Sequence, residues 1–545
     1  MRGTPSDAAV SREPARPGAG GTGGSRRGTR WPLGWLVVVL PALAELIVGG
    51  YRIGGPSLWR DEAATISGSQ RPVSAIAAMV QHEDAVHGPY YLLMHLVIAA
   101  GGISATTLRL PSLIAMCLAV GLTAALGRRL AQASGMAVPQ AAGLLAGLAL
   151  TAVPLTTRYA QEARPYALTT LFAVLATYLL VRAVASPRWP WWALYATALV
   201  LTGLFSLASM LLVGAHLVSL LVTRRTRPAD DAQAARPPWR RLLGGWLAAC
   251  AAAAVLLTPI AVLSAGQSAQ LNWVRTPDLS TIATLVRDFA GSAVLIPVIA
   301  LLALAGCVEG RGLRRGGGLT LTVIALPWLV LPPALLLAVS LVHPLYVERY
   351  VLFCLPALAL LTSAGLIWIA RMTRRALAGR GLPGRRADLL AAAAPAVLVV
   401  VIAAALIGPQ RAIRLDSARA DNLRAVAALI ARHELPGDAI LYLPRDTELV
   451  SVAYPAPFRR LRDIGLGRTA VASGTLRGTQ AGPSAVAARL RQVRRVWTVQ
   501  WAVPLSRATE APASQTRLLA PMPMIGRWRI QSVILRLYLV GSHRG

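Results

Sequence analysis

Long apolar runs separated by short polar segments dominate this chain. A helix needs roughly 20 apolar residues to cross the hydrocarbon core of a bilayer, and about eleven runs approach that length. They lie near residues 31–50, 108–127, 138–155, 165–184, 190–206, 208–223, 242–264, 287–307, 319–341, 349–370 and 389–408. The fifth and sixth runs join, so their boundary near Leu207 is weakly marked. The pattern predicts an α-helical polytopic membrane protein with about eleven transmembrane helices.

The apolar stretch from Pro89 to Ala100 decides the topology. It is about a dozen residues long, which is too short for a span, so we expect an interfacial helix there. Arginines before the first run place the N-terminus in the cytoplasm. If the short stretch is not counted as a span, every later basic loop also lies inside, as the positive-inside rule requires. These loops contain Arg128 and Arg129, Arg182 to Arg188, Arg224 to Arg227, Arg311 to Arg315 and Arg371 to Arg386.

Composition supports a membrane protein and gives the charge a topological meaning. The 545 residues are 55% hydrophobic and 14% charged, with a mean hydropathy of +0.55, which is too apolar for a soluble protein. The net charge of +32 comes from arginines spread over loops and tails, without one lysine, so it does not indicate nucleic-acid binding. The four cysteines stand in apolar runs and predict neither disulfides nor a metal site.

Three regions follow from the patterning. Residues 1–30 are rich in Gly, Pro, Arg and Ser and predict a disordered cytoplasmic tail. Residues 31–408 form the membrane domain, with an outer loop at 51–107. Residues 409–545 are of mixed charge and predict a small extracytoplasmic α/β domain. It should contain a helix over 421–433 and strands over 439–443, 494–503 and 527–540. No catalytic motif is visible in it, so a folding or docking role is its simplest interpretation.

Polar segments gather on the outer face in this topology. The first is the loop with the adjacent carboxylates Asp61 and Glu62, and the others are Arg158 to Tyr166, the 266–286 loop and His343 to Tyr350. Charged groups at membrane depth are costly and are generally kept for function. We therefore expect the functional site where these segments meet.

The order of these motifs resembles a known enzyme family. An Asp-Glu pair after the first span, His87-Gly-Pro-Tyr-Tyr91, Leu108-Arg109-Leu-Pro-Ser112 and Ala163-Arg-Pro-Tyr166 together are similar to the family 39 glycosyltransferases. These are membrane enzymes of the GT-C superfamily, such as protein O-mannosyltransferases and aminoarabinose transferases of lipid A. The resemblance covers about residues 31–410 and is stronger for the superfamily than for the substrate.

The resemblance implies transfer of a monosaccharide, with mannose expected, from a polyprenyl-phosphate donor to an acceptor on the outer face. Asp61 matches the catalytic aspartate of the family and is expected to be the general base, with Glu62 as its orienting partner. Arginine suits the donor phosphate because its fork binds two oxygens and keeps its proton. Arg349, Arg164 and Arg109 are the candidates, in that order. Salt bridges or anchoring of helix ends would also explain these arginines.

A second group of residues is expected to support the site or contact substrate, namely His87, Tyr90, Glu162, Tyr350 and Asp84. His87 would contact the acceptor or orient Asp61, although capping of the interfacial helix is the simpler interpretation. The spacing of His82 and His87 does not match a zinc-peptidase motif. No cofactor is required; a divalent cation held loosely by His87, Glu62 and Asp84 stays open, because some relatives bind one.

Two other classes stay open, a transporter or flippase for lipid-linked sugars and a non-catalytic scaffold. A transporter would favour inverted repeats and charges near the middle of the bilayer. Here the charges cluster at one face, which favours an enzyme of the inner or plasma membrane. The partners implied are the bilayer, the lipid-linked donor and a glycan, lipid or protein acceptor. The residues do not identify the sugar, the acceptor, the oligomeric state or the task of the external domain.

Overall fold

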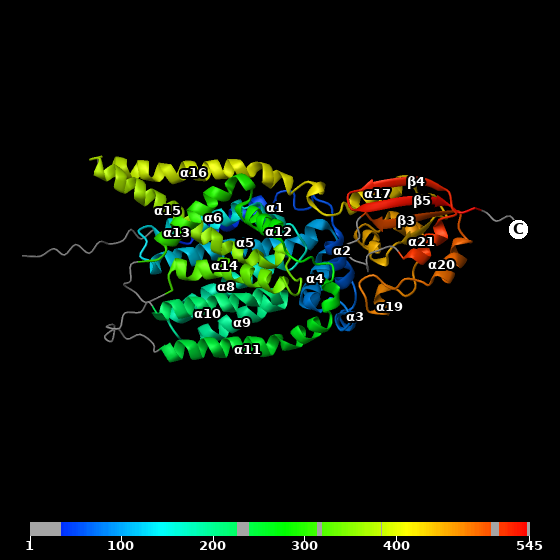
Figure 1. Ribbon diagram of the computed structural model, residues 1–545, viewed down its shortest axis with the longest axis horizontal. Coiled ribbons are helices and arrows are strands. Elements are labelled where there is room, and N and C mark those ends of the chain that lie inside the picture. Colours follow the sequence, from blue (N-terminus) through cyan, green and yellow to red (C-terminus); the bar gives the residue numbers. More distant parts are fainter. Residues whose placement is uncertain (1–33, 226–238, 313–318, 383, 503–511, 542–545) are drawn as a thin grey trace, which may run out of the picture. The chain divides into compact units, whose positions relative to one another are not determined.

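Apolar helices arranged side by side form the larger part of the molecule (Figure 1). The computed structural model describes residues 34–225, 239–312, 319–382, 384–502 and 512–541. The expected tail at 1–30 and the basic residues Arg227, Arg314 and Arg315 lie outside the described residues.

The bundle contains the helices predicted from the apolar runs. They are α1 (Leu36–Gly50), α5 (Ala105–Ala133), α6 (Pro139–Ala152), α7 (Pro154–Ala160), α8 (Tyr166–Ala185), α9 (Trp189–Phe205), η2 (Leu207–Met210) with α10 (Leu211–Arg225), α11 (Trp239–Gly266), α12 (Leu279–Ala290), η5 (Ala293–Leu295) with α13 (Ile296–Glu309), α14 (Leu321–Ser340), η6 (Glu348–Cys354) with α15 (Leu355–Gly379), and α16 (Gly384–Ala412). Each predicted run overlaps one helix or one broken helix. The mainly helical polytopic fold is therefore confirmed.

The count of eleven spans is not confirmed. Within the described residues, seven helices are long and apolar enough to cross a membrane, or nine if two bent pairs each count as one span. The α6–α7 pair bends by 69° because Pro154 lacks an amide hydrogen and forces Val153 out of the helical region. The α12–α13 pair bends by 81° after Gly291, whose φ is +82°. The helices α1 and α9 have only 15 and 17 residues.

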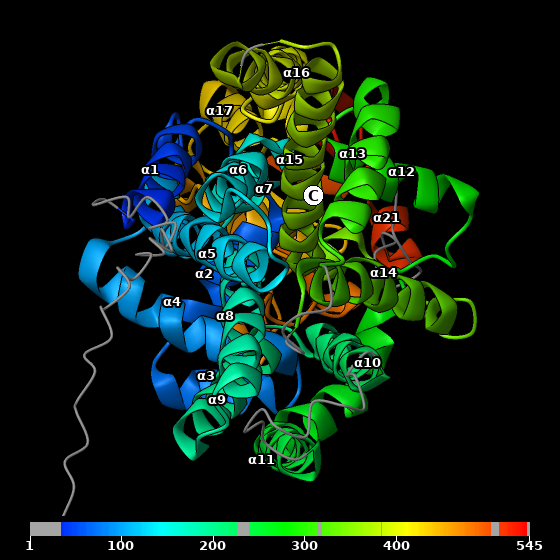
Figure 2. The same ribbon diagram turned by 90° about the vertical axis from the view of Figure 1, so that its left-hand side faces the viewer.

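The helix α4 (Gly88–Gly101) does not run with the bundle. It has 14 residues and is not among the candidate spans in the described residues. In Figure 2 the helices α11 and α16 are seen end-on, whereas α4 is seen along its length, so it crosses the bundle axis. This orientation agrees with the interfacial helix predicted from its length. The short helices α2 (Arg60–Ser69) and α3 (Val73–Val80), with η1 (Ala85–His87), belong to the same layer.

Close helix packing holds the bundle together at α13 and α15. A Cβ atom added at Gly306 would lie 1.9 Å from the carbonyl oxygen of Leu361, and one added at Gly365 would lie 2.1 Å from that of Leu302. Only glycine permits such an approach, and close contact of backbones is how membrane helices associate. Both glycines are therefore required by the packing.

The C-terminal region forms a five-stranded mixed sheet with flanking helices. The strands β1 (Ala439–Tyr442), β2 (Arg462–Asp463), β3 (Arg495–Trp501), β4 (Met524–Ile530) and β5 (Val533–Leu539) take the order β2-β1-β3-β5-β4. The strand β1 is parallel to β2 and β3, and β5 is antiparallel to β3 and β4. The helices are η7 (Asp416–Ala418), α17 (Leu423–His433), η8 (Arg445–Glu448), α18 (Leu449–Ala453), η9 (Pro457–Arg460), α19 (Ala470–Ser473), α20 (Pro483–Leu490) and α21 (Ala513–Leu519).

One predicted strand in this region was wrong. The run 527–540 is a hairpin rather than a single strand, because the chain reverses at Gln531 and Ser532. Gln531 has a φ of +49°, a conformation of tight turns. The flanking sequence is apolar on both sides of the turn, which hid the reversal from the hydrophobic pattern.

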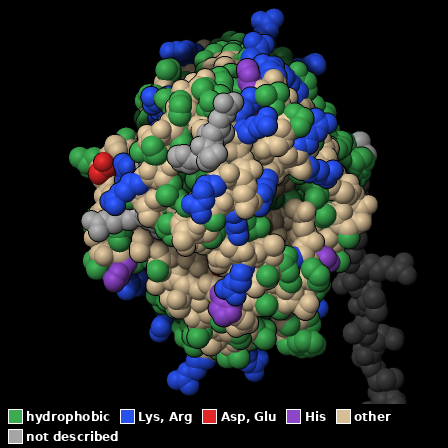
Figure 3. All heavy atoms as spheres, turned by 90° about the vertical axis from the view of Figure 1, so that its right-hand side faces the viewer, with side chains coloured by type: hydrophobic (Ala, Val, Ile, Leu, Met, Phe, Trp, Pro, Cys, Tyr) green, Lys and Arg blue, Asp and Glu red, His purple; other side chains and the backbone are tan. Residues whose placement is uncertain are grey.

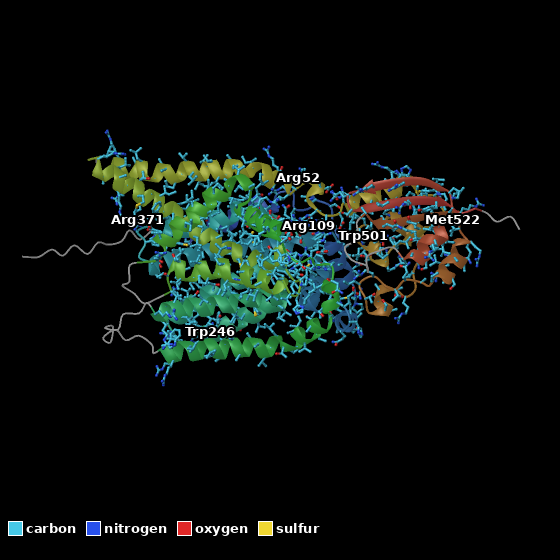
Figure 4. The ribbon with its side chains drawn as sticks, viewed as in Figure 1. Arg52, Arg109, Trp246, Arg371, Trp501 and Met522 are labelled. Atoms are coloured by element: carbon cyan, nitrogen blue, oxygen red, sulfur yellow. The ribbon has the colours of Figure 1, made fainter. Side chains whose placement is uncertain are left out.

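The sheet domain packs on the end of the bundle that carries α2 and α4 (Figure 1). One apolar cluster runs from Ala63 and Ile66 of α2 to Val426 and Ile430 of α17, so the two regions share a core. Figure 4 shows Arg109 at this end of the bundle and Arg371 and Trp246 at the opposite end. Seen from the domain's side, Figure 3 shows many arginine side chains and few acidic ones. The site described next lies where the bundle and the sheet domain meet.

Candidate active site

The helix α2 directs its two adjacent carboxylates in different directions. Asp61 and Glu62 stand in its first turn, where negative charge is favoured by the helix dipole. Successive residues of a helix point about 100° apart. The Glu62 side chain is therefore fully buried, whereas the Asp61 side chain keeps 22% of its surface exposed. Only Asp61 can meet a substrate.

Glu62 forms a closed pair with Arg109 of α5. The guanidinium Nε and Nη2 atoms each donate to one carboxylate oxygen of Glu62 over 2.7 Å. Arg109 also donates to the carbonyl oxygens of Ile53, Pro56 and Ser57, and Glu62 accepts from the amide of Ala163. Burial alone would raise the pKa of Glu62, but Arg109 lowers it below its ordinary value, so Glu62 stays ionised. Because Arg109 is fully buried and its donors are used, this geometry gives no support to a phosphate contact.

Asp61 faces Arg349, which lies at the start of η6. The Nη2 atom of Arg349 is 3.5 Å from Oδ2 of Asp61, and both side chains are partly exposed. Three aromatic rings surround this guanidinium, with Cζ 5.8 Å from the ring of Tyr166, 5.7 Å from that of Trp273 and 6.0 Å from that of Tyr350. Aromatic rings attract a cation at such distances. They fix Arg349 beside Asp61 without occupying all its donors.

A second arginine is held by a relay from η1. Arg164 donates from Nη2 to Nε2 of His87 over 2.7 Å. Since arginine can only donate, the proton of the neutral imidazole must be on Nδ1. That nitrogen lies 2.5 Å from Oδ1 of Asp84, which also accepts a hydrogen bond from the Tyr91 hydroxyl on its other oxygen. The order Asp84, His87, Arg164 therefore fixes both the tautomer and the guanidinium.

The ionisation of this relay follows from its surroundings. Burial and the charge of Arg164 lower the pKa of His87 more than Asp84 raises it, so the ring is neutral near pH 7. Burial alone would raise the pKa of Asp84, but His87, Arg164 and Tyr91 together bring it below its ordinary value. Burial would lower the pKa of Arg164, but Tyr166, Asp61 and other acidic groups raise it. Arg164 therefore remains a permanent cation near Asp61.

The segment between α7 and α8 carries a further buried ion pair. Glu162 accepts from Nη1 of Arg419 over 2.6 Å, and Arg419 also donates to the carbonyl oxygen of Gln161. Both side chains are 1% exposed. Burial raises the pKa of Glu162 despite Arg419, because the carboxylate is removed from water. Glu162 thus anchors the linker that follows α16 and does not reach Asp61.

Several polar atoms near Asp61 and Arg349 are buried without a hydrogen-bond partner in the described part of the chain. They include the Nε atoms of Arg349, Arg164 and Arg158, the Tyr166 hydroxyl and the acceptor oxygen Oε1 of Glu162. Buried polar groups in proteins are nearly always paired, and such exceptions are common where a ligand binds. Donors outnumber acceptors in this set. The site is therefore arranged to receive oxygen atoms, such as those of a phosphate.

The remaining predicted residues differ in position. Tyr350 joins the site through Arg349 and through Tyr166, whose ring centroid is 6.3 Å from its own. Tyr90 is fully buried in the apolar cluster beneath α2, away from a substrate. The loop after α11 contributes Trp273, and its Gln267 and Gln270 accept hydrogen bonds from the amides of Ala85 and Asp84. That loop therefore holds η1 in place.

Sequence reasoning missed a set of residues from the C-terminal region. The carboxylate of Asp421 accepts from the Arg60 amide over 3.1 Å and from its guanidinium over 2.8 and 2.6 Å. The amide of Ser57 donates to Asp416, and that of Leu58 to the Tyr454 hydroxyl. These contacts join residues 359 to 396 positions apart, so no local pattern could have indicated them. Arg158, by contrast, stood in a segment already singled out.

The loose cation site left open for His87, Glu62 and Asp84 is not assembled. Both oxygens of Glu62 are bound by Arg109, and His87 and Asp84 are paired with each other. Within the described residues, no group of three or more His, Cys, Asp or Glu side chains could hold a metal ion. The residues present do not fit a divalent cation at this place.

Comparisons with known proteins bear on the fold of the chain. Residues 87–231 match the model of the dolichyl-phosphate-mannose-protein mannosyltransferase family. No curated protein matches the chain in sequence. The chain is similar in structure to ArnT from Cupriavidus metallidurans bound to undecaprenyl phosphate, with a TM-score of 0.57 and 16% identity over 92% of this chain and 97% of that one. The apo state of ArnT gives a TM-score of 0.55 and 15% identity over the same shares.

The family resemblance inferred from the motifs is thereby confirmed at the level of the fold. The structural alignment with ArnT includes the C-terminal sheet as well as the bundle, since it covers 92% of this chain. The archaeal oligosaccharyltransferase AglB from Archaeoglobus fulgidus also aligns, with a TM-score of 0.44 and 12% identity over 85% of this chain and 69% of that one. The chain has the fold of the GT-C membrane glycosyltransferases.

Proposed function

We propose that this protein is a membrane glycosyltransferase that moves a monosaccharide, with mannose expected, from a polyprenyl-phosphate donor to an acceptor on the outer face. The observation that carries the proposal is Asp61, partly exposed, lying 3.5 Å from Arg349 and close to Arg164. A carboxylate beside two cations suits a reaction that takes a proton and releases a phosphate. The match of residues 87–231 to a family named for dolichyl-phosphate-mannose supports a lipid-phosphate donor.

The mechanism uses Asp61 as the general base. The acceptor hydroxyl attacks the anomeric carbon of the donor sugar while Asp61 takes its proton. The bond between that carbon and the phosphate oxygen breaks, and its electron pair leaves with the polyprenyl phosphate. Attack opposite the leaving group inverts the anomeric centre. Asp61 then returns its proton to water, so atoms and charge balance.

Arg349 and Arg164 stabilise the departing phosphate. Each keeps a buried Nε atom without a partner in the described residues, so each can donate to phosphate oxygens without breaking its present contacts. A fixed pair of guanidinium groups costs little reorganisation as negative charge develops on the leaving group. Arg109 is left out of this set, because its donors are used by Glu62. Glu62 and Arg109 together hold α2 in position.

The donor and acceptor approach from the face that carries the C-terminal domain, which we assign to the outside of the inner or plasma membrane. The opposite end carries Arg371, in an ion pair of 2.5 Å with Glu309, and the exposed Arg374. Basic residues in short loops favour the cytoplasm, which supports this orientation.

The proposal is tested by sugar transfer from radiolabelled polyprenyl-phosphate sugars to a cell-envelope extract, using purified protein in detergent. Asp61→Asn keeps the shape of the side chain and removes the base, so we expect transfer to fall by roughly 10²–10⁴-fold. Donor binding, measured separately, should persist. Asp388→Asn is the matched control, because Asp388 is 55% exposed and pairs with Arg374 rather than with the site.

Two results would count against the mechanism. Undiminished transfer by Asp61→Asn would exclude Asp61 as the base. Donor binding by wild-type protein with no transfer from any sugar would instead favour a transporter of lipid-linked sugars.

A further inference from the structure

A cleft lined by polar, charged and proline side chains lies between the C-terminal domain and the outer loop that follows α3. Its volume is about 660 Å³. One wall is formed by His82 and Glu83 with Gln270, and the other by side chains of the C-terminal domain, chiefly Asp446, Arg477 and Gln480. None of these residues takes part in the chemistry proposed for Asp61.

The lining of the cleft excludes several classes of ligand. The arginines of the lining are paired with carboxylates, since Arg477 binds Glu83 over 2.5 Å within the cleft and Arg445 binds Asp463 outside it over 2.6 Å. A polyanion needs an excess of positive charge, which these pairs neutralise. A lipid chain needs a continuous apolar surface, whereas here charged side chains interrupt the apolar area to which Pro444 and Pro512 contribute. A neutral ligand rich in hydroxyl groups needs neither an excess of positive charge nor a continuous apolar surface. Its hydroxyls bond equally to donors and acceptors.

Two acceptor atoms on the C-terminal wall lack a partner among the described residues. They are the buried Oδ1 of Asp446 and the buried Oε1 of Gln480. The other oxygen of Asp446 accepts from the indole nitrogen of Trp501 over 2.9 Å, and the amide nitrogen of Gln480 donates to Gln515 over 2.6 Å. Both side chains are thereby oriented, with one acceptor left for a donor. An unmade bond at a buried acceptor is costly, and ligand hydroxyls can supply it.

Each wall of the cleft leads to the candidate active site. On the outer-loop wall, Gln270 accepts from the amide of Asp84, which begins the relay through His87 to Arg164. On the opposite wall, Asp446 bonds to Trp501, and the guanidinium of Arg60 lies 3.9 Å from the centre of a Trp501 ring. Arg60 directly precedes Asp61. Both walls are therefore linked by hydrogen bonds and ring contacts to the segments that carry Arg164 and Asp61.

We propose that this cleft binds the acceptor and that the acceptor is a neutral glycan chain. The inference rests on the proposed function, because the cleft gains its role from the contacts that link its walls to the segments carrying Arg164 and Asp61. The hydroxyls of one sugar unit would donate to Asp446 and Gln480, while a neighbouring unit presents its hydroxyl to Asp61. The C-terminal domain then selects the acceptor, and the bundle binds the donor.

Binding is measured without any transfer, so the two proposals can fail separately. Full-length protein in detergent is titrated with neutral tetrasaccharides (mannotetraose, maltotetraose, cellotetraose and chitotetraose) and followed by saturation-transfer difference NMR. We expect at least one to bind wild type. Gln480→Leu removes the acceptor and should weaken binding about tenfold, which is typical of one lost hydrogen bond to a buried group. Asp446→Asn keeps the bond from Trp501 and should weaken binding less.

Gln492→Leu is the matched control, because Gln492 is exposed in the same domain and outside the cleft. Circular dichroism and thermal unfolding establish that each variant is folded.

Asp61→Asn should bind the same tetrasaccharide as wild type while losing transfer, and Gln480→Leu should raise the KM for acceptor without changing the KM for donor. Absence of binding by all four sugars would overturn the inference, as would binding that Gln480→Leu and Asp446→Asn leave unchanged. Preferential binding of an acidic polysaccharide or a peptide in the same assay would also overturn it.

Discussion

At the scale of single residues, His87 shows how a hydrogen-bond pattern determines a charge state. Its Nε2 accepts from Arg164 and its Nδ1 faces Asp84, so a proton added at Nε2 would break the contact with the guanidinium. The pKa of His87 is accordingly below 6.5 in the folded protein. At pH values between the lowered pKa of the folded state and 6.5, the unfolded chain binds more protons than the folded one. Stability contributed by this residue is therefore present above pH 6.5 and is lost as the pH falls.

We expect His87→Gln to reduce the acid sensitivity of the protein. The glutamine oxygen can replace Nε2 as acceptor for Arg164, but it takes up no proton. The fall in melting temperature between pH 6.5 and 5 should be smaller in the variant than in wild type, measured by thermal unfolding in detergent. His433→Gln, far from Arg164 in sequence and in the C-terminal domain, should keep the wild-type slope. An equal slope in all three proteins would show that His87 does not titrate against Arg164.

The pair of Glu62 and Arg109 makes a different prediction at the same scale. Removing one member of a fully buried ion pair leaves an uncompensated charge, which costs about 3–5 kcal/mol. Glu62→Ala and Arg109→Ala should each lower the melting temperature strongly, and the double variant should lose less than the sum of the two. Additive losses would mean that the two residues act independently, as expected if Arg109 served a phosphate instead.

At the scale of elements, α2 depends on a cap from a distant part of the chain. Its N-cap residue, Trp59, provides no side-chain hydrogen bond of its own. Asp421, with no exposed surface, supplies it by accepting from the Arg60 amide and by binding the Arg60 guanidinium. Amides at Ser57 and Leu58 are also bound by Asp416 and Tyr454. The C-terminal domain thus fixes the turn that presents Asp61.

Asp421→Ala should therefore lower the rate of sugar transfer more than it changes donor binding. Loss of the cap costs about 0.5–2 kcal/mol and leaves Arg60 without its partner, so Asp61 loses its fixed orientation. We expect kcat to fall about tenfold or more while the KM for donor stays within about twofold, since small misplacements of a base are costly. Asp421→Asn retains an acceptor for the amide and should recover part of the rate. A change confined to the KM for donor would contradict a positioning role.

The elements themselves were largely predictable, because hydrophobic runs and helix length are local properties. The run from Pro89 to Ala100, separated from the spans by its length, forms a 14-residue helix that crosses the bundle axis. What the pattern could not supply were the breaks at Pro154 and Gly291 and the turn at Gln531, where one residue redirects a run that remains apolar. The count of eleven spans stays unconfirmed, because two runs bend at Pro154 and Gly291 and the helices α1 and α9 have only 15 and 17 residues.

At the scale of the whole molecule, the sequence predicted which residues gather at the candidate site better than it predicted which of them pair with one another. The alternation of loops between the two sides of the membrane indicated that Asp61, Arg164 and Arg349 should meet. They lie together at one end of the bundle. The sequence did not reveal which arginine pairs with which carboxylate, because only the fold buries Arg109 against Glu62 and leaves Arg349 beside Asp61. The contributions of Asp421 and Arg419 depend on contacts across most of the chain and have no local signal.

The same alternation of inner and outer loops predicts the orientation of the protein in the membrane. Ala456 is exposed in the C-terminal domain, and Ala378 is exposed in α15 beyond Arg371, at the other end of the bundle. In a variant without the four native cysteines, Ala456→Cys should react with a membrane-impermeant maleimide in intact cells. Ala378→Cys should react only after the membrane is opened, because Arg371 and its basic neighbours favour the cytoplasm.

The two substitutions are matched in size and exposure, so a difference in labelling reports the side of the membrane alone. The reverse pattern would place Asp61 in the cytoplasm, where soluble nucleotide sugars are available and a lipid-linked donor is not needed. Outward exposure of Ala456 instead removes nucleotide sugars from reach of the site. A donor that is carried through the membrane by its own lipid then becomes the only supply consistent with the position of Asp61, Arg164 and Arg349.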